Sequence, residues 1–205
     1  MQTTTPQPVW QPTLPADQIP MNLYRWHVNR KFGQTITTTQ ELHRWSVTHP
    51  HDFWLDLHDY TGIIPKLPAG MQYAYDPHCP MSEVPKFFEG GEVNYAENVL
   101  AGKPLDKLAL VGIREKEAVS GDQWTWGRLA ETVRKVQSAL KVNGVQKGDR
   151  IGAIISTSVW SVVLFLATAS IGAVWTSIAP DIGEEVGFRG FSCAASFIYM
   201  LMVEM

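Results

Sequence analysis

The sequence predicts an α/β protein in which a helical N-terminal extension precedes an incomplete parallel-sheet subdomain. Up to Leu100 the chain is rich in aromatic residues and proline, with short helical patterns separated by loops. From Lys107 onward, short apolar runs alternate with amphipathic stripes, and Ile151 to Pro180 contains no charged residue. The order strand, helix, strand, helix, strand with short turns predicts one parallel sheet with right-handed crossovers.

Residues 1–20 are expected to form a disordered leader. Glutamine, threonine and proline dominate this stretch, and so few apolar residues cannot offset the entropy of ordering it. Residues 21–100 are expected to form an extension of helices and loops. Its first part, Met21 to Gly33, is aromatic and is expected to pack against another element.

Two short helices are expected next. Thr39 is a suitable N-cap for the first. Pro50 fits the first turn of the second, where its missing N–H is harmless, and Gly62 fits its end. The first helix carries Leu42, Trp45 and Val47, and one face of the second carries Phe53, Trp54, Leu57 and Tyr60. Residues 62–91 read as loop, and Gly91 to Leu100 reads as a short capped helix.

Residues 101–182 are expected to begin the α/β domain. Strands are predicted at Leu108–Ile113 and Asp122–Trp126, followed by a helix that Thr125 caps. The apolar stripe of this helix consists of Leu129, Val133, Val136 and Leu140. Glu131 and Lys135 form a favourable i,i+4 ion pair, and Gly144 follows the end of the helix.

The second half of this region predicts a further strand, helix and strand. Arg150–Ile155 reads as a buried strand and Ala173–Ser177 as the next one. Gly172 is expected to close the helix between them. Its N-cap is expected to be one of three consecutive hydroxyl residues, Ser156, Thr157 or Ser158.

Composition excludes several classes of protein. The net charge is −3, with lysine and arginine scattered, so neither a nucleic-acid surface nor a polybasic membrane tether is expected. Cys79 and Cys193 have no metal-like or redox-like spacing, which favours a reducing compartment. Residues 1–20 lack the pattern of a secretory signal, so the expected location is cytoplasmic.

Other features favour ordinary structural roles. His49, His51 and His58, with His78 beside Cys79, match no standard zinc spacing, so no metal site is predicted. Core packing is the favoured interpretation of the tryptophans, and those placed on buried faces are Trp45, Trp54, Trp126, Trp160 and Trp175.

A small membrane protein is the alternative that the uncharged stretches raise. Ile151–Pro180 is interrupted by serine, threonine and glycine where caps and turns are expected, and buried sheet strands are also uncharged. Phe191–Val203 is short for a span. The soluble α/β interpretation is therefore preferred, with no membrane partner.

Several separated motifs, in order, resemble the N-terminal subdomain of acyl-CoA synthetases, in the adenylate-forming superfamily. They are Trp124-Thr-Trp-Gly-Arg-Leu-Ala, Gly144-Val-Gln-Lys-Gly-Asp-Arg-Ile-Gly and Ala169-Ser-Ile-Gly-Ala-Val-Trp. The front section is similar to the acetoacetyl-CoA synthetase family. It contains Asp52-Phe-Trp, Phe87-Phe-Glu-Gly-Gly-Glu-Val-Asn-Tyr-Ala-Glu-Asn-Val-Leu and Val174-Trp-Thr-Ser-Ile-Ala-Pro-Asp-Ile-Gly. The resemblance covers about Leu23 to Ile182.

The resemblance implies ATP-dependent ligation of acetoacetate to CoA through an acetoacetyl-AMP intermediate, with Mg²⁺. The family's phosphate-binding loop, ribose-binding aspartate and catalytic lysine lie downstream of the matched part and have no counterpart here. No catalytic residue is therefore assigned, and the chain is expected to be inactive alone. The alternative is a non-enzymatic fragment that binds the full-length enzyme or, weakly, CoA.

One site is implied by the resemblance. In acetyl-CoA synthetases the loop after the strand matching Ala173–Ser177 borders the adenine of CoA, and the matching positions here are Ala179, Pro180 and Asp181. Acetyl-CoA synthetases have a Gly-Gly-Phe type motif where this chain has Pro180-Asp181-Ile182. The alternative is a simple turn that closes the sheet, because Pro-Asp is an ordinary turn former.

The tail, residues 183–205, is expected to be aberrant. Family members continue into an Arg-Phe-Ser-Gln type helix, whereas Val186 is followed here by Gly-Phe-Arg-Gly-Phe-Ser-Cys. This abrupt change suggests a frame shift or a retained intron. A sheet truncated at this point would expose an open edge and apolar faces, which predicts poor solubility.

Overall fold

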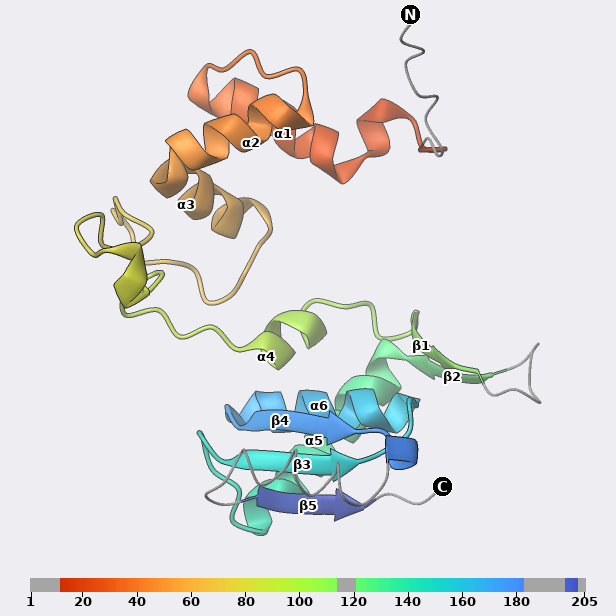
Figure 1. Cartoon of the computed structure of the whole chain (residues 1–205). Helices are drawn as coiled ribbons and strands as arrows, with labels where there is room; N and C mark the ends of the chain where they lie inside the picture. The colour runs from red at the N-terminus through yellow and green to blue at the C-terminus, as the bar shows by residue number, and fades with distance from the viewer. Residues whose placement is uncertain (1–11, 114–120, 183–197, 203–205) are drawn as a thin grey trace, which may run out of the picture. The chain divides into compact units, whose positions relative to one another are not determined.

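The computed structural model describes residues 12–113, 121–182 and 198–202 (Figure 1). The chain divides into two compact units. The first consists of Met1–Gly62 with Lys66–Gly91, and the second of Ile63–Pro65 with Glu92–Met205. Within the region expected to be a leader, the structure describes a single 3-10 turn at Ala16–Gln18 before the first helix. The expectation for residues 1–11 and most of the tail lies outside the described residues.

The first unit is built on three helices, α1 (Pro20–Phe32), α2 (Thr39–Thr48) and α3 (Pro50–Tyr60). Proline occupies the first turn of α1 and α3, where no N–H is needed. Gly33, with φ of 63°, ends α1 in the left-handed conformation that glycine adopts without strain. The aromatic Met21–Gly33 segment therefore packs as a helix, and the buried cluster it joins is Tyr24, Val28, Ile36, Leu42 and Trp45.

The N-cap of α2 is Thr38, so the prediction of Thr39 is wrong by one residue. Thr38 Oγ1 accepts from the N–H of Glu41 at 3.1 Å, and the Glu41 carboxylate accepts from the N–H of Thr38 at 3.0 Å. Only Thr38 has a glutamate three residues later, which this reciprocal capping box requires. The Val47 side chain is 59% exposed, because a residue two positions after Trp45 lies on the opposite face of a helix.

The segment between α3 and the next helix is mostly loop, as predicted, with one 3-10 turn at Met81–Glu83. Helix α4 (Tyr95–Leu100) confirms the predicted short capped helix, and its N-cap is Asn94. The Asn98 side chain accepts from the N–H of Ile64 at 2.9 Å and donates to its carbonyl at 2.8 Å. This pair of bonds explains why Ile63–Pro65 belongs to the second unit.

The first two strands of the second unit form a separate hairpin. β1 (Leu108–Gly112) pairs antiparallel with β2 (Asp122–Thr125), so the expectation that β2 joins the parallel sheet is wrong. Thr125 ends β2 and also caps α5 (Trp126–Val142). A parallel crossover needs a connection that folds the helix back over the strand, and none exists between β2 and α5. β2 therefore pairs with β1, the strand that precedes it in the sequence.

The parallel sheet has the order β4–β3–β5 (Figure 1). β3 (Arg150–Ile154) and β4 (Val174–Ile178) pair in register over five residues, from Arg150 opposite Val174 to Ile154 opposite Ile178. They are joined by α6 (Val159–Ile171), whose N-cap is Ser158 and which ends at Gly172 with φ of 81°. This strand–helix–strand unit confirms the predicted parallel pair.

β5 (Ile198–Met202) lies in the tail and pairs with β3 in parallel. Its five residues are in continuous register with Arg150–Ile154. The segment therefore occupies an edge of the sheet. How the tail arises in the gene is a separate question, and its aberrant origin stays a prediction.

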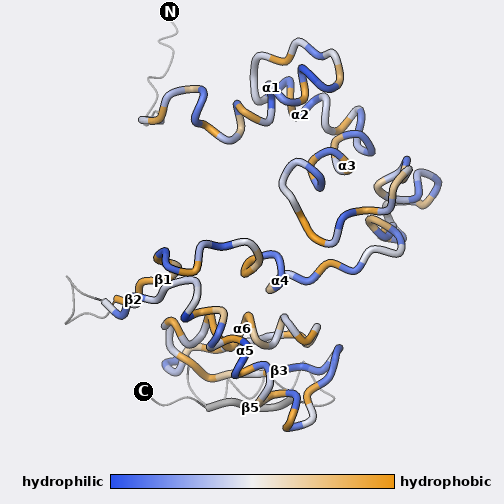
Figure 2. The backbone as a smooth tube through the Cα atoms, turned by 180° about the vertical axis from the view of Figure 1, so that it is seen from behind, coloured by the Kyte–Doolittle hydropathy of each residue, from blue (hydrophilic) through white to orange (hydrophobic). Residues whose placement is uncertain are grey.

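Helices α5 and α6 supply the core of the second unit. The predicted stripe of α5 is buried at Leu129, Val133 and Leu140 and packs with Ile151 of β3 and Val163 of α6. Helix α6 has no charged residue, and Figure 2 shows the hydrophobic colouring of this part of the chain, which shares its core with α5 and β3.

Tryptophan burial differs partly from the prediction. Trp45 is 5% exposed and Trp124 is 2% exposed, so both are core residues. Trp54 and Trp160 are 39% and 37% exposed. Both still make ring contacts, Trp54 with Phe53 and Phe87 and Trp160 with Trp124. None of the described helices combines the length and apolar character that a membrane span requires.

The packing of α5 is testable with two substitutions in the same helix. Leu129→Ala removes a side chain that is 1% exposed and is expected to lower the free energy of unfolding by about 2–5 kcal/mol. Val142→Ala, at a position that is 87% exposed, is the control and should change it by less than about 0.5 kcal/mol. Urea unfolding followed by circular dichroism measures both, and equal effects would contradict the described core.

Candidate functional site

The carboxyl ends of β3 and β4 define the candidate site. In open α/β sheets, ligands bind beyond the carboxyl edge of the parallel strands. The two strands end together here, because the N–H of Ile155 donates to the carbonyl of Ile178 at 3.0 Å. The segments that leave this edge are 155–158, which leads into α6, and 179–182.

The three residues predicted to border CoA lie at this edge. Ala179 follows β4 directly, and Pro180 and Asp181 begin a 3-10 turn at Pro180–Ile182. All three residues are exposed. The turn that was the alternative interpretation is therefore present, and it presents an apolar surface and one carboxylate to solvent.

Helix α6 begins at the same edge. The hydroxyl of Ser161 donates to the carbonyl of Ser158 at 2.6 Å and accepts from its N–H at 3.4 Å. Ser158 is thus the cap among the three hydroxyl residues considered. Ser156 and Thr157 precede it and are exposed, so their hydroxyls are available to a ligand.

The chemistry of this edge is limited to recognition. Segments 155–158 and 179–182 contribute hydroxyls, backbone groups and the Asp181 carboxylate, with no lysine or arginine. Transfer of a nucleotidyl group requires amides or cations placed around phosphates. The described residues of this edge do not fit the triphosphate of ATP, whereas an apolar and hydroxyl-bearing rim is compatible with the flat base of a nucleotide.

A hollow of about 320 Å³ lies between α4, α5 and α6. It is lined by Glu97, Arg134, Gln137 and Ser170, among others, and the Gln137 amide donates to the Ser170 hydroxyl at 2.8 Å. Ser170 lies twelve residues after Ser158, about 18 Å along a helix. The hollow is therefore at the other end of α6 from the strand edge.

No group of three or more histidine, cysteine, aspartate or glutamate side chains within the described ranges is arranged to hold a metal ion. The rings of His27, His51 and His58 instead contact other side chains or the backbone, as described below. Cys193 lies outside the described residues.

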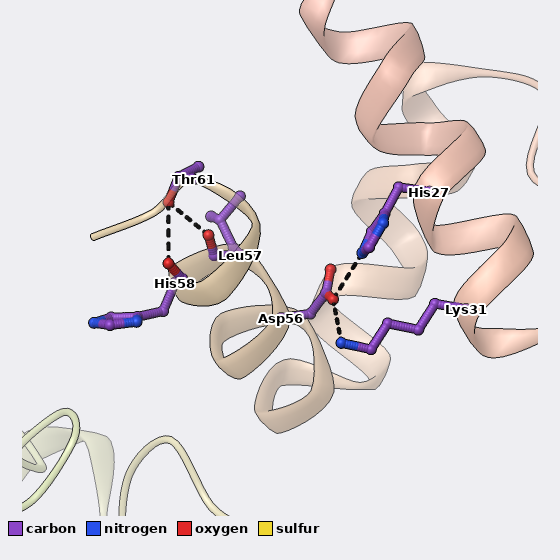
Figure 3. A network of polar contacts seen from close by, with 6 residues as sticks. All are labelled: His27, Lys31, Asp56, Leu57, His58 and Thr61. Carbon is purple, nitrogen blue, oxygen red and sulfur yellow. Dashed lines mark hydrogen bonds and ion pairs between the residues drawn. The ribbon is translucent and has the colours of Figure 1, made fainter. Parts of the chain in front are cut away.

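The sequence patterns did not predict that Asp56, in the first unit, is buried. Asp56 of α3 is 3% exposed. Its Oδ1 accepts from Lys31 Nζ at 2.7 Å and is 2.9 Å from His27 Nε2 (Figure 3). Both partners come from α1, so the cluster of these three residues joins α1 to α3.

The charge of Asp56 determines the electrostatics of this cluster. Burial opposes its ionisation, but the hydrogen bonds from His27 and Lys31 outweigh burial and hold the pKa of Asp56 below its ordinary value. Burial raises the pKa of the Tyr24 phenol, and the neighbouring Asp56 charge raises it further. The cluster is thus an ion pair that joins two helices.

Two sequence signals point to this cluster in retrospect. His27 and Lys31 are four residues apart and so share one face of α1. Asp56 lies between Phe53 and Leu57, on the face of α3 that packs inward. An acid on an apolar face requires a partner, and a pair of basic groups on a neighbouring helix supplies one.

The chain matches a known protein family and is similar to known CoA synthetases. Residues 96–189 match the protein family described as AMP-binding enzyme. A malonamoyl-CoA synthetase of Penicillium aethiopicum is 37% identical over 161 residues, which is 76% of this chain and 22% of that protein. Acetoacetyl-CoA synthetase of Xenopus tropicalis is 34% identical over 173 residues, 84% of this chain and 25% of that protein.

A solved structure agrees with these relatives. Acetoacetyl-CoA synthetase from Streptomyces lividans superposes with a TM-score of 0.76 and 29% identity, covering 91% of this chain and 29% of that one. The chain spans about a quarter of the length of the curated relatives it matches, 22% and 25% for the two above.

These matches indicate the class of protein. Residues 96–189 match the AMP-binding enzymes, and the chain has the fold of the N-terminal part of an acetoacetyl-CoA synthetase. Within that class, it is similar to the acetoacetyl-CoA synthetases over most of its own length. The resemblance inferred from the motifs is thereby confirmed.

The ion pair at Asp56 is testable by Asp56→Asn. The amide cannot balance the charge of Lys31, so we expect the free energy of unfolding to fall by about 1–3 kcal/mol, reduced from a fully buried pair because Lys31 is half exposed. Asp59→Asn is the matched control, because Asp59 is an exposed residue of the same helix. Urea unfolding at pH 7 compares them.

The same pair predicts a pH dependence. Because the pKa of Asp56 is lowered on folding, its contribution is fully present above the ordinary value of 3.8 and is lost as the pH falls through the lower value of the folded state. The difference between the wild type and Asp56→Asn should therefore shrink below pH 3.8. A constant difference down to pH 2 would contradict an ionised Asp56.

Proposed function

We propose that this chain supplies the N-terminal part of an ATP-dependent ligase that joins acetoacetate to CoA. The observation that carries the proposal is the 0.76 TM-score match to an acetoacetyl-CoA synthetase over 91% of the chain. In the proposed reaction the acetoacetate carboxylate attacks the α-phosphorus of ATP and displaces pyrophosphate. The CoA thiolate then attacks the carbonyl carbon of acetoacetyl-AMP and displaces AMP.

The role of this chain in that reaction is to build one wall of the binding region. The β3–β4 edge carries hydroxyls at Ser156 and Thr157 and an apolar turn at Ala179 and Pro180. We assign this turn, with Asp181, to the border of the CoA adenine. Support comes from its place at the carboxyl edge of parallel strands, where nucleotides bind in α/β folds.

Phosphate handling, Mg²⁺ binding and proton transfer are assigned to other parts of the ligase. The edge residues include no cation for the developing charge on phosphate, and transition-state stabilisation depends on such groups. This chain by itself is therefore proposed to be inactive. We place the reaction in the cytoplasm, in keeping with the reducing compartment that the sparse cysteines favour.

A chimera tests the proposed function. Residues 23–182 replace the matched segment of the Streptomyces lividans acetoacetyl-CoA synthetase, and ATP–pyrophosphate exchange is measured with acetoacetate, acetate or no acid. Exchange that depends on acetoacetate is expected for the chimera and background exchange for this chain alone. The parent enzyme and the parent lacking the segment are the controls. A folded chimera without acetoacetate-dependent exchange would contradict the proposal.

The CoA border has its own test in the same chimera. Asp181→Ala is expected to raise the KM for CoA about threefold to tenfold, the loss of one polar contact, with the KM for ATP unchanged. Asp106→Ala is the control, because the Asp106 side chain is 75% exposed and, within the described residues, forms its ion pair with its neighbour Lys107. Equal KM values for CoA in both variants would assign residues 179–181 to a simple turn.

A further inference from the structure

Two histidines of α3 hold the segment 71–91 in the first unit. His51 and His58 are seven residues apart, two turns of helix, so they project from the same side of α3. His51 contacts Tyr73 and Tyr75, with ring centroids at 5.1 Å and 4.6 Å. The His58 ring lies 5.1 Å from that of Phe88.

The contact at His51 requires a neutral ring. The N–H of Ala74 donates to His51 Nδ1 at 3.3 Å. A ring nitrogen accepts a hydrogen bond only through its lone pair, so the hydrogen of the neutral ring is on Nε2. A proton on Nδ1 would turn this acceptor into a donor that faces the Ala74 N–H.

The contact at His58 requires a neutral ring for a different reason. The residue is 4% exposed, and its Nε2 is buried without a hydrogen-bond partner. A positive charge placed there would be removed from water with no acceptor to compensate it.

The two contacts are connected through the backbone of the segment. Ala74 is 0% exposed, and its carbonyl accepts from the N–H of Phe88 at 2.7 Å. A continuous path therefore runs from His51 through Ala74 and Phe88 to His58. Loss of either histidine contact weakens the attachment of both ends of the segment.

Neither histidine has a carboxylate to balance a proton. In the described part of the chain, no ion pair within 4.0 Å includes His51 or His58, whereas His27 is paired with Asp56. Tyr73 and Tyr75 are the titratable groups whose rings contact His51, and Phe88 beside His58 is apolar. The other charged residues carried by α3 and the segment are Asp52, Asp56, Asp59, Asp76, Glu83, Lys86 and Glu89, with His78 also titratable.

We propose that His51 and His58 form a proton-sensitive latch that releases the segment 71–91 from α3 when the pH falls. Imidazoles take up protons between about pH 7 and pH 5. The attached state needs both rings neutral, so the attachment is complete above this range and weakens as the pH falls through it.

Hydrogen–deuterium exchange of the whole chain at pH 7.5 and pH 5.5 tests the latch. After correction for the intrinsic pH dependence of exchange, peptides from 71–91 are expected to exchange at least about tenfold faster at pH 5.5, because one linked proton changes the equilibrium about tenfold over the pH unit below the ordinary imidazole pKa. Peptides from α1 provide the internal control. No acceleration in the wild type would overturn the proposal.

Two substitutions separate the latch from a general effect of acid. His51→Asn keeps an acceptor near the place of Nδ1, and His58→Phe keeps an aromatic ring against Phe88, but neither new side chain titrates. The double variant is expected to lose the acceleration, and each single variant to reduce it. His78→Asn, at an exposed histidine in the same segment, should respond like the wild type. An unchanged acceleration in both single variants would overturn the assignment to these rings.

Discussion

Packing of α5 and α6 on the parallel strands β3 and β4 is the constraint on which the second unit depends. Ile151, Leu129 and Val163 are each no more than 1% exposed, and they come from β3, α5 and α6. Burial of such side chains is the main favourable term in folding. Because this core fixes both strands, it also fixes where they end. The segments 155–158 and 179–182 are therefore held at one edge, where the proposed CoA border lies.

In the first unit a polar interaction has the corresponding role. The Asp56 carboxylate, with His27 and Lys31, joins α1 to α3 inside a mostly aromatic environment. The same helix presents His51 and His58 to the segment 71–91. Of these three histidines, His27 has a carboxylate partner and the other two have none in the described residues. The contacts of α3 with α1 and with the segment 71–91 therefore differ in their electrostatics.

Local patterns predicted the elements whose stability is local. The Thr125 cap, the α5 stripe and the Gly172 terminus depend on residues within a few positions, and all three are confirmed. Contacts between residues far apart in the sequence were harder to predict from local patterns. The pairing of β2 with β1 follows from the missing turn before α5, and the burial of Asp56 depends on α1, which is 25 residues away at Lys31. Of the candidate site, residues 179–181 were selected through a family resemblance, and periodicity alone would not have selected them. Their role at the border of CoA stays a prediction.

We propose that this chain is the front part of an acetoacetate–CoA ligase. The most direct measurement is full-length cDNA sequencing across the codons for Asp181 to Met205. We expect the transcript to continue from Ile182 into an Arg-Phe-Ser-type helix and a Gly-rich phosphate-binding loop. Independent transcripts that all carry the tail in a clean frame and end at Met205 would contradict this claim and would favour a short protein with a binding function.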